Sequence, residues 1–134
     1  MILGIDPGSR RVGVAIADTE TRFARPLEVI DVNETDPTMR IAELVGEHGV
    51  SVVVVGRPTS LSGRAGPAVD VQQAFVDGLR AVLEVSIVEH DERLTTVLAD
   101  QGLRAAGGSQ KARAAQRDAV AAQVMLQSYL DASS

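Results

Sequence analysis

The chain has 134 residues, which is enough for one domain of ordinary size, and 45% of them are hydrophobic. It has no cysteine, which excludes disulfides and thiolate metal sites. Two phenylalanines and one tyrosine are its only aromatic residues, which excludes the exposed aromatic platforms on which many RNA-binding modules stack bases.

The net charge of −5 disfavours contact with a phosphate backbone, which attracts basic proteins. Eight of the thirteen basic residues are nevertheless clustered, and a bound divalent cation would reverse the charge around it. The clustered residues are Arg10, Arg11, Arg57, Arg64, Arg93, Lys111, Arg113 and Arg117. The overall charge therefore does not exclude a nucleic-acid partner. No segment has the pattern of a signal peptide or the length of a membrane span, so we expect a cytoplasmic protein without a membrane partner.

The first part of the chain predicts three strands and a helix. The strands are expected at Ile2–Asp6, Val12–Asp18 and Pro26–Val32. The connection between the first two is a turn that begins at Asp6 and is too short for a crossover helix, so these strands should pair antiparallel. A helix should follow, with Asp36 as its N-cap, Pro37 in its first turn and its end at His48.

The rest of the chain alternates between strands and helices. Ser51–Val55 contains four consecutive valines, a pattern typical of a parallel strand that is buried on both faces. The remaining expected elements are a loop at Gly56–Pro67, a helix at Ala68–Leu83, a strand at Val85–His90, and helices at Thr95–Ala106 and Gln110–Asp131.

This order predicts one α/β domain over residues 1–134. An antiparallel meander of three strands should be extended by parallel strands into a five-stranded mixed sheet, with helices on both faces. Ligands in such sheets usually lie beyond the carboxyl ends of the strands, which indicates where to look for a site.

Carboxylates end two of the expected strands. Asp6 ends the first strand, and Asp91 and Glu92 follow the fifth. If these two strands are parallel, all three acids lie at one edge of the sheet. Each of them, taken alone, could also simply cap a turn or the next helix.

Asp118 is the most informative acid, because it lies on the apolar face of the last helix. That face is formed by residues spaced three or four apart, namely Ala115, Asp118, Ala122, Met125 and Tyr129. An unpaired charge there would be costly. An arginine partner would make Asp118 structural, whereas a metal ion shared with Asp6 would make it catalytic. Lys111 lies two turns earlier on the same face.

Together these acids predict a site for a hard divalent cation. Oxygen ligands suit Mg²⁺ or Mn²⁺, and no histidine or cysteine of the last helix favours zinc. Few carboxylates would leave coordination positions for phosphate oxygens, which is the arrangement used in metal-assisted phosphoryl transfer. His48, near a helix end, and His90, inside a strand, are not expected to be ligands.

Four segments resemble the YqgF (RuvX) family, whose members are described as Holliday-junction resolvases and as pre-16S rRNA nucleases. The residues with which the four segments start are Gly4-Ile5-Asp6-Pro7-Gly8, Val55-Gly56-Arg57-Pro58, Asp91-Glu92-Arg93-Leu94-Thr95-Thr96 and Asp118-Ala119-Val120-Ala121-Ala122. The resemblance covers essentially the whole chain. It implies a ribonuclease H-like fold. It also implies that Asp6, Glu92 and Asp118 are catalytic metal-binding acids, with Asp91 as the alternative to Glu92.

The resemblance also implies residues that hold phosphates, because guanidinium groups, hydroxyls and backbone N–H groups suit that role. Those expected to contact nucleic acid are Arg10, Arg57, Arg64, Arg93 and Lys111, with Thr59 and Ser60 beside them.

The substrate stays open at this point. Processing of the 5′ end of precursor 16S rRNA is favoured on family grounds, with a four-way DNA junction as the alternative. Symmetric cutting of a junction requires two sites, so the protein could be a monomer or a homodimer. A non-catalytic ribosome-assembly or transcription factor is a further alternative. An ATP-binding fold of the actin type is disfavoured because it needs two domains, and the loop after Gly56 lacks the lysine of a P-loop.

Overall fold

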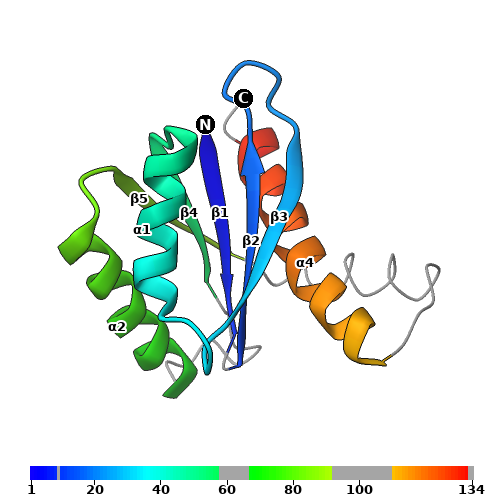
Figure 1. The fold of residues 1–134 in the computed structure, drawn as a ribbon. Coiled ribbons are helices and arrows are strands. Elements are labelled where there is room, and N and C mark those ends of the chain that lie inside the picture. The colour runs from blue at the N-terminus through cyan, green and yellow to red at the C-terminus, as the bar shows by residue number, and fades with distance from the viewer. Residues whose placement is uncertain (9, 58–66, 92–109, 133–134) are drawn as a thin grey trace.

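The computed structural model describes residues 1–8, 10–57, 67–91 and 110–132, and its ribbon is shown in Figure 1. The predicted helix Thr95–Ala106 and most of the predicted loop before Pro67 lie outside these residues. The described elements are β1 (Ile2–Pro7), β2 (Arg11–Ala17), β3 (Ala24–Asp31), α1 (Pro37–His48), β4 (Val52–Arg57), α2 (Pro67–Val82), β5 (Ser86–Asp91) and α4 (Gln110–Ala132).

The five strands form one mixed sheet in the order β3-β2-β1-β4-β5. β1, β2 and β3 make the predicted antiparallel meander, and β4 and β5 add to β1 in parallel. β4 is longer than predicted, because Gly56 and Arg57 stay paired with His90 and Asp91 of β5 instead of beginning the loop. The predicted fold class is therefore confirmed.

α1 has the predicted bounds because both of its ends are capped by local chemistry. The side chain of Asp36 accepts a hydrogen bond from the backbone N–H of Thr38, at 3.0 Å, and Pro37 fits the first turn. Gly49 ends the helix in the left-handed conformation, with φ of 62°, and its N–H bonds to the carbonyl of Val45.

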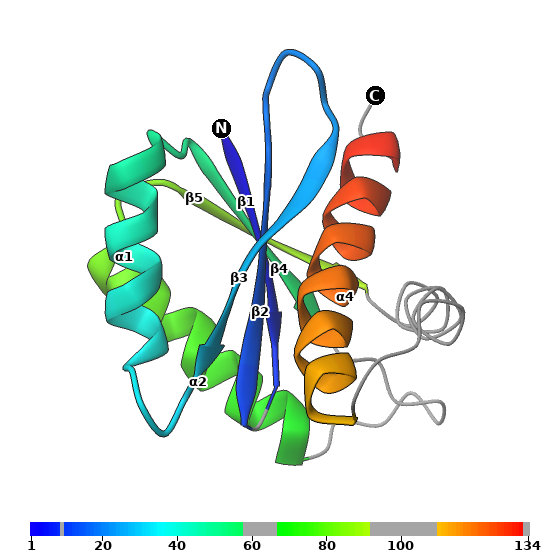
Figure 2. The same ribbon diagram turned by 45° about the vertical axis from the view of Figure 1, so that its right-hand side comes forward.

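Helices cover both faces of the sheet, as Figure 2 shows: α1 and α2 lie on one face and α4 on the other. Side chains of successive strand residues alternate between these faces. Leu3 and Ile5 of β1 belong to the core under α1 and α2, whereas Ile2 belongs to the core under α4. This alternation decides which face each residue at the end of β1 occupies.

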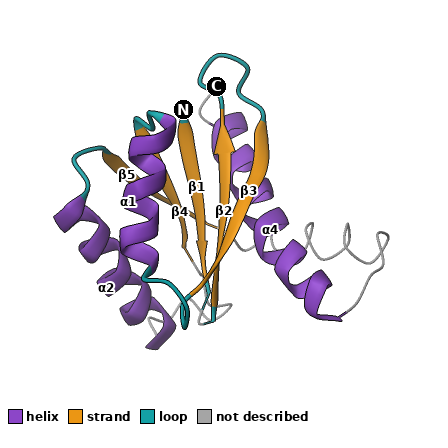
Figure 3. Cartoon of the chain, viewed as in Figure 1, coloured by secondary structure: helices purple, strands orange, loops and turns teal. Residues whose placement is uncertain are grey.

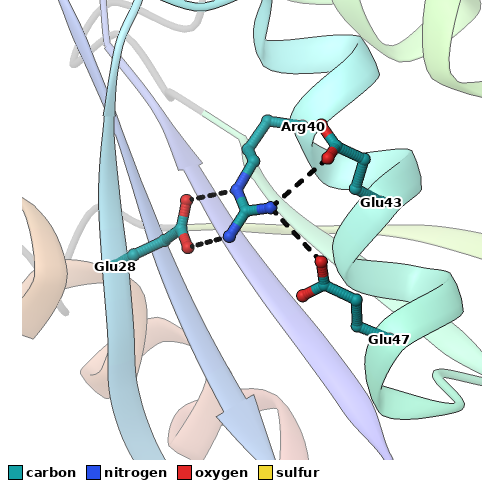
Figure 4. Close-up of polar contacts among 4 residues, drawn as sticks. All are labelled: Glu28, Arg40, Glu43 and Glu47. Atoms are coloured by element: carbon teal, nitrogen blue, oxygen red, sulfur yellow. Dashed lines mark hydrogen bonds and ion pairs between the residues drawn. The ribbon is translucent and has the colours of Figure 1, made fainter.

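An ion pair ties α1 to the edge strand β3 (Figure 4). Arg40 donates two hydrogen bonds to Glu28, at 2.9 Å from Nε and 2.8 Å from a terminal nitrogen. Glu43 and Glu47 of α1 lie within ion-pair distance of the same guanidinium. The hydrogen bonds to Glu28 are the main reason that the pKa of Arg40 is raised above its ordinary value.

α4 holds the loop between β2 and β3, which lies beside the carboxyl end of the helix in Figure 3. The side-chain amide of Gln127 accepts from the N–H of Ala24, at 2.9 Å, and donates to the carbonyl of Arg22, at 3.0 Å. Arg22, which has φ of 59°, donates to the carbonyl of Leu130 at 2.7 Å. The carboxyl end of α4 is thereby held at the loop between β2 and β3, and these contacts help to set the orientation of the helix on the sheet.

Candidate active site at the carboxyl edge of the sheet

The parallel strands β1, β4 and β5 all end at one edge of the sheet, to which the arrow of β1 points in Figure 1. Asp6 is the next-to-last residue of β1, and Arg57 and Asp91 end β4 and β5. The register pairs Arg57 with Asp91. The expected parallel arrangement of the first and fifth strands is therefore present, and it brings their ends to the same edge.

Asp6 lies on the face of the sheet that α4 covers. Ile5 belongs to the core on the opposite face, and the next residue along a strand points the other way. Asp6 is half-buried there. The same alternation places the exposed Arg57 on the face of α1 and α2, since Val55 belongs to their core. Arg57 thus shares the edge with Asp6 but lies on the other face.

Glycines flank Asp6 on both neighbouring strands. Gly13 of β2 is the antiparallel partner of Asp6, and Gly56 of β4 follows the paired residues Ile5 and Val55. Neither glycine has a side chain to cover the acid. On the face of α4, no side chain from these two positions therefore lies between Asp6 and the helix.

α4 approaches the sheet closely at two glycines of the sheet, Gly13 of β2 and Gly4 of β1. A Cβ atom at Gly13 would overlap the backbone carbonyl of Asp118, and one at Gly4 would lie 2.8 Å from Cβ of Leu126. Ala122, on the same side of the helix, is fully buried. Because Gly13 is paired with Asp6, this contact sets Asp118 one strand away from Asp6.

Asp118 has an arginine partner in this structure. Its Oδ2 accepts a hydrogen bond of 2.6 Å from Nε of Arg11, the first residue of β2. The side chain of Arg11 is 34% exposed and that of Asp118 is 26% exposed. Asp118 is thus at the margin of the apolar face rather than inside it, because the deeper positions of that face are taken by Ala122 and Met125. Of the two partners expected for this acid, the structure contains the arginine.

Sequence reasoning missed Arg11, although a signal for it was present. Arg11 stands two residues before Gly13, so strand alternation assigns both to the face of α4. His90 is a second polar residue of that face that received no role. Its Nε2 lies 3.2 Å from Oγ of Ser128, and its ring packs edge-on against Tyr129. These contacts connect the end of β5 to α4.

Several predicted site residues cannot be placed. Glu92, Arg64, Arg93, Thr59 and Ser60 lie outside the described residues. Asp91 and Lys111 belong to β5 and α4, but their side chains are not described. Arg10 is exposed directly before β2. Of the predicted acids whose side chains are described, Asp6 is paired with Gly13 and the backbone of Asp118 lies against Gly13. No group of three potential metal ligands is found in the described part of the chain.

The described donors fit a hard divalent cation. Asp6 and Asp118 offer carboxylate oxygens from adjacent parts of one face, without a thiolate or an imidazole between them. Two acids and open coordination positions are the usual protein share of a site that also binds phosphate oxygens.

The helices were compared with the length and hydropathy of a membrane span. Among those that the structure describes, none is long and apolar enough to cross a bilayer.

Comparison with curated proteins gives relatives over nearly the whole chain. A protein of Chloroflexus aggregans named "Putative pre-16S rRNA nuclease" is 48% identical over 132 residues, which cover 98% of this chain and 93% of the relative. A protein of Bacillus thuringiensis with the same name is 41% identical over 133 residues, with 97% of each chain covered.

Solved structures share the fold at low sequence identity. RuvC of T. thermophilus, in complex with a Holliday junction substrate, matches with a TM-score of 0.59 at 16% identity, over 98% of this chain and 94% of that chain. The Fowlpox virus resolvase, in complex with Holliday junction DNA, matches with a TM-score of 0.58 at 11% identity, over 98% and 97%. The ribonuclease H-like fold that the family resemblance implied is confirmed by these matches. The family model described as "RuvX: Holliday junction resolvase" matches residues 1–132, and the chain belongs to this family.

Proposed function

We propose that this protein is a divalent-metal-dependent nuclease that hydrolyses phosphodiester bonds during 5′-end processing of precursor 16S rRNA in the cytoplasm. The observation that carries the proposal is the approach of α4 to Gly13, which brings Asp118 beside Asp6 at the carboxyl edge of the sheet. The names of the relatives at 48% and 41% identity supply the substrate.

Asp6, Asp118 and Glu92 would hold the divalent metal. Bound Mg²⁺ or Mn²⁺ would supply an activated water and stabilise the leaving oxygen. The chain's own contribution is to fix the acids on a rigid sheet and helix, and to bind the backbone on either side of the cut. Arg10 and Arg57, both exposed at this edge, suit contacts with phosphates outside the acidic centre.

We favour Glu92 over Asp91 as the third acid, from its spacing in the sequence. His90 contacts Ser128 and Tyr129, so it lies on the face of α4, which is also the face of Asp6. Glu92 is two residues after His90 in the sequence, which is the spacing of residues that share a face in an extended chain. Glu92 itself lies outside the described residues.

A four-way DNA junction is the second candidate substrate. The description of the family model favours it, and so does the likeness to resolvases solved with such junctions. Junction resolution needs two active sites related by two-fold symmetry, so this reading requires a homodimer. If the protein cuts RNA as a monomer, this result agrees with rRNA processing and not with junction resolution.

The test compares cleavage of a labelled precursor 16S rRNA 5′ segment with cleavage of a labelled four-way DNA junction. Each substrate is incubated with Mn²⁺, Mg²⁺ or EDTA, using the wild type, Asp6→Asn, Asp118→Asn and the control Asp77→Asn, an exposed acid of α2. We expect metal-dependent cutting of the RNA. Because metal ions contribute several kcal/mol to such transition states, each active-site variant should lose at least about 100-fold in rate, and the control should not.

Each other outcome would overturn part of the proposal. Preferential cutting of the junction by a dimer would replace the substrate. Equal cutting by wild type and Asp6→Asn would place the active site elsewhere. Retained binding with both substrates intact under every condition would identify a non-catalytic factor.

A further inference from the structure

The contact between Arg11 and Asp118 raises a question about the proposed metal site. Asp118 is one of its ligands, yet one of its two carboxylate oxygens already accepts a short hydrogen bond from a guanidinium. Carboxylate bonds to a charged donor at such distances are among the stronger hydrogen bonds in proteins. A cation that approaches Asp118 must therefore share this carboxylate with Arg11 or displace it.

Two observations indicate that Arg11 can leave. Its side chain keeps 34% of its exposure and that of Asp118 keeps 26%, so the pair is open to solvent and its net stability is modest. The bond uses Nε alone, and among the described residues the structure gives the terminal nitrogens of Arg11 no acceptor. An arginine has five N–H donors in a planar fork, so most of those of Arg11 have no acceptor among the described residues.

A substrate phosphate is the anion that this position suits. Arg11 begins β2 on the face of α4, so it lies on the same side of the sheet as Asp6. A guanidinium binds phosphate oxygens through two parallel hydrogen bonds, which one carboxylate oxygen on Nε does not provide. A phosphodiester at the active site would thus offer Arg11 a partner with better geometry than Asp118.

We propose that Arg11 pairs with Asp118 in the unliganded protein and transfers to a backbone phosphate when nucleic acid binds, freeing Asp118 for the metal ion. This inference rests on the proposed function and adds to it a positioning residue and an order of assembly. Metal ion and nucleic acid then bind cooperatively, and the coupling is reciprocal, since each ligand raises the affinity for the other by the same factor.

The experiment measures the affinity for Mn²⁺ by electron paramagnetic resonance of the free ion, with and without a short 2′-O-methyl RNA. A methylphosphonate oligomer of the same sequence, which has no backbone charge, is the ligand control. The variants are Arg11→Gln, Arg11→Lys and the matched control Arg25→Gln, which removes an exposed arginine from the far end of β3. Thermal unfolding verifies that each variant is folded.

We expect the wild type to bind Mn²⁺ at least about two- to fivefold more tightly when the charged oligomer is present, which matches the strength of a partly exposed ion pair. Arg11→Gln should bind Mn²⁺ more tightly than the wild type when no oligomer is present, and should gain less affinity from the oligomer than the wild type does. Arg11→Lys should restore part of the coupling, because it keeps the charge but not the fork. A purely structural role for Arg11 would change stability without changing this coupling.

The proposal is overturned if Arg11→Gln without oligomer binds Mn²⁺ as weakly as the wild type, or if its affinity rises with the charged oligomer by as large a factor as that of the wild type. An equal response of the wild type to the uncharged oligomer would also contradict it. Failure of the proposed function gives a different result. If Asp118 does not bind the metal ion, Asp118→Asn would bind Mn²⁺ as tightly as the wild type does, without oligomer and with either oligomer.

Discussion

At the scale of single residues, the site depends on the absence of side chains as much as on their presence. Gly13 lets the backbone of α4 pass directly over β2, and this contact brings Asp118 to the strand beside Asp6. Interiors are packed too densely to absorb an added atom at such a point. The glycine therefore belongs to the architecture of the site, although it carries no chemistry.

Replacing Gly13 with alanine should move α4 and reduce stability and activity together. The new Cβ would meet the carbonyl of Asp118, which is backbone and cannot rotate away. We expect a loss of about 1–3 kcal/mol in the free energy of unfolding, the usual cost of overpacking, as measured by urea titration.

Gly46 offers the matched control, because a Cβ there would meet nothing within 4 Å. It lies inside α1, where glycine is less favourable than alanine, so Gly46→Ala should stabilise the protein by about 0.5–1 kcal/mol. Equal effects of the two substitutions would show that close packing at Gly13 is not what matters.

At the scale of elements, α4 has two tasks at its two ends. Its first half carries Asp118 to the carboxyl edge of the sheet, and its last turns bind the loop between β2 and β3 through Gln127 and Leu130. A rigid helix transmits the position of one end to the other. The loop contacts therefore help to set the acid, although they lie at the opposite end of the sheet.

Gln127→Ala tests this link. The substitution leaves the N–H of the buried Ala24 without its acceptor and the carbonyl of Arg22 without one donor. A buried polar group that loses its partner costs about 1–3 kcal/mol, which chemical denaturation would detect.

The control for that variant is Gln73→Ala on the exposed face of α2, where the amide makes a single bond to Asp77 four residues later. Such pairs contribute about 0.2–0.5 kcal/mol, so the control should change stability little. If both variants lose the same amount, the loop does not depend on α4.

At the scale of the whole molecule, a metal ion shared by β1 and α4 should stabilise the fold. A ligand that binds only the native state adds about 2.7 kcal/mol when its free concentration is roughly 100 times its Kd. For a domain of this size, that corresponds to a rise in Tm on the order of 10 °C. Scanning calorimetry with saturating Mn²⁺, then with EDTA, measures the effect directly.

Asp6→Asn and Asp118→Asn should each lose most of this Mn²⁺-dependent rise. Glu34→Gln, an exposed acid after β3, removes the same charge and should keep the rise in full. A rise in Tm that survives in both active-site variants would mean that the ion binds elsewhere on the acidic surface.

The sequence alone determined the elements that the structure describes, their order and the edge of the sheet at which Asp6 lies. α1 was predicted to the residue because its caps, Asp36 and Gly49, act within a few positions of themselves. The valines of β4 and the short turn after Asp6 likewise predicted parallel and antiparallel pairing, which follow from local periodicity and connection length.

Only the tertiary structure decided what Asp118 contacts. Arg11 is 107 residues away in the chain, and its pairing depends on how α4 is rotated and how closely it approaches β2. The contact from Gln127 to the loop is of the same kind. Such contacts depend on packing between elements distant in sequence, and a local pattern of residues can show that a charged group needs a partner without identifying it.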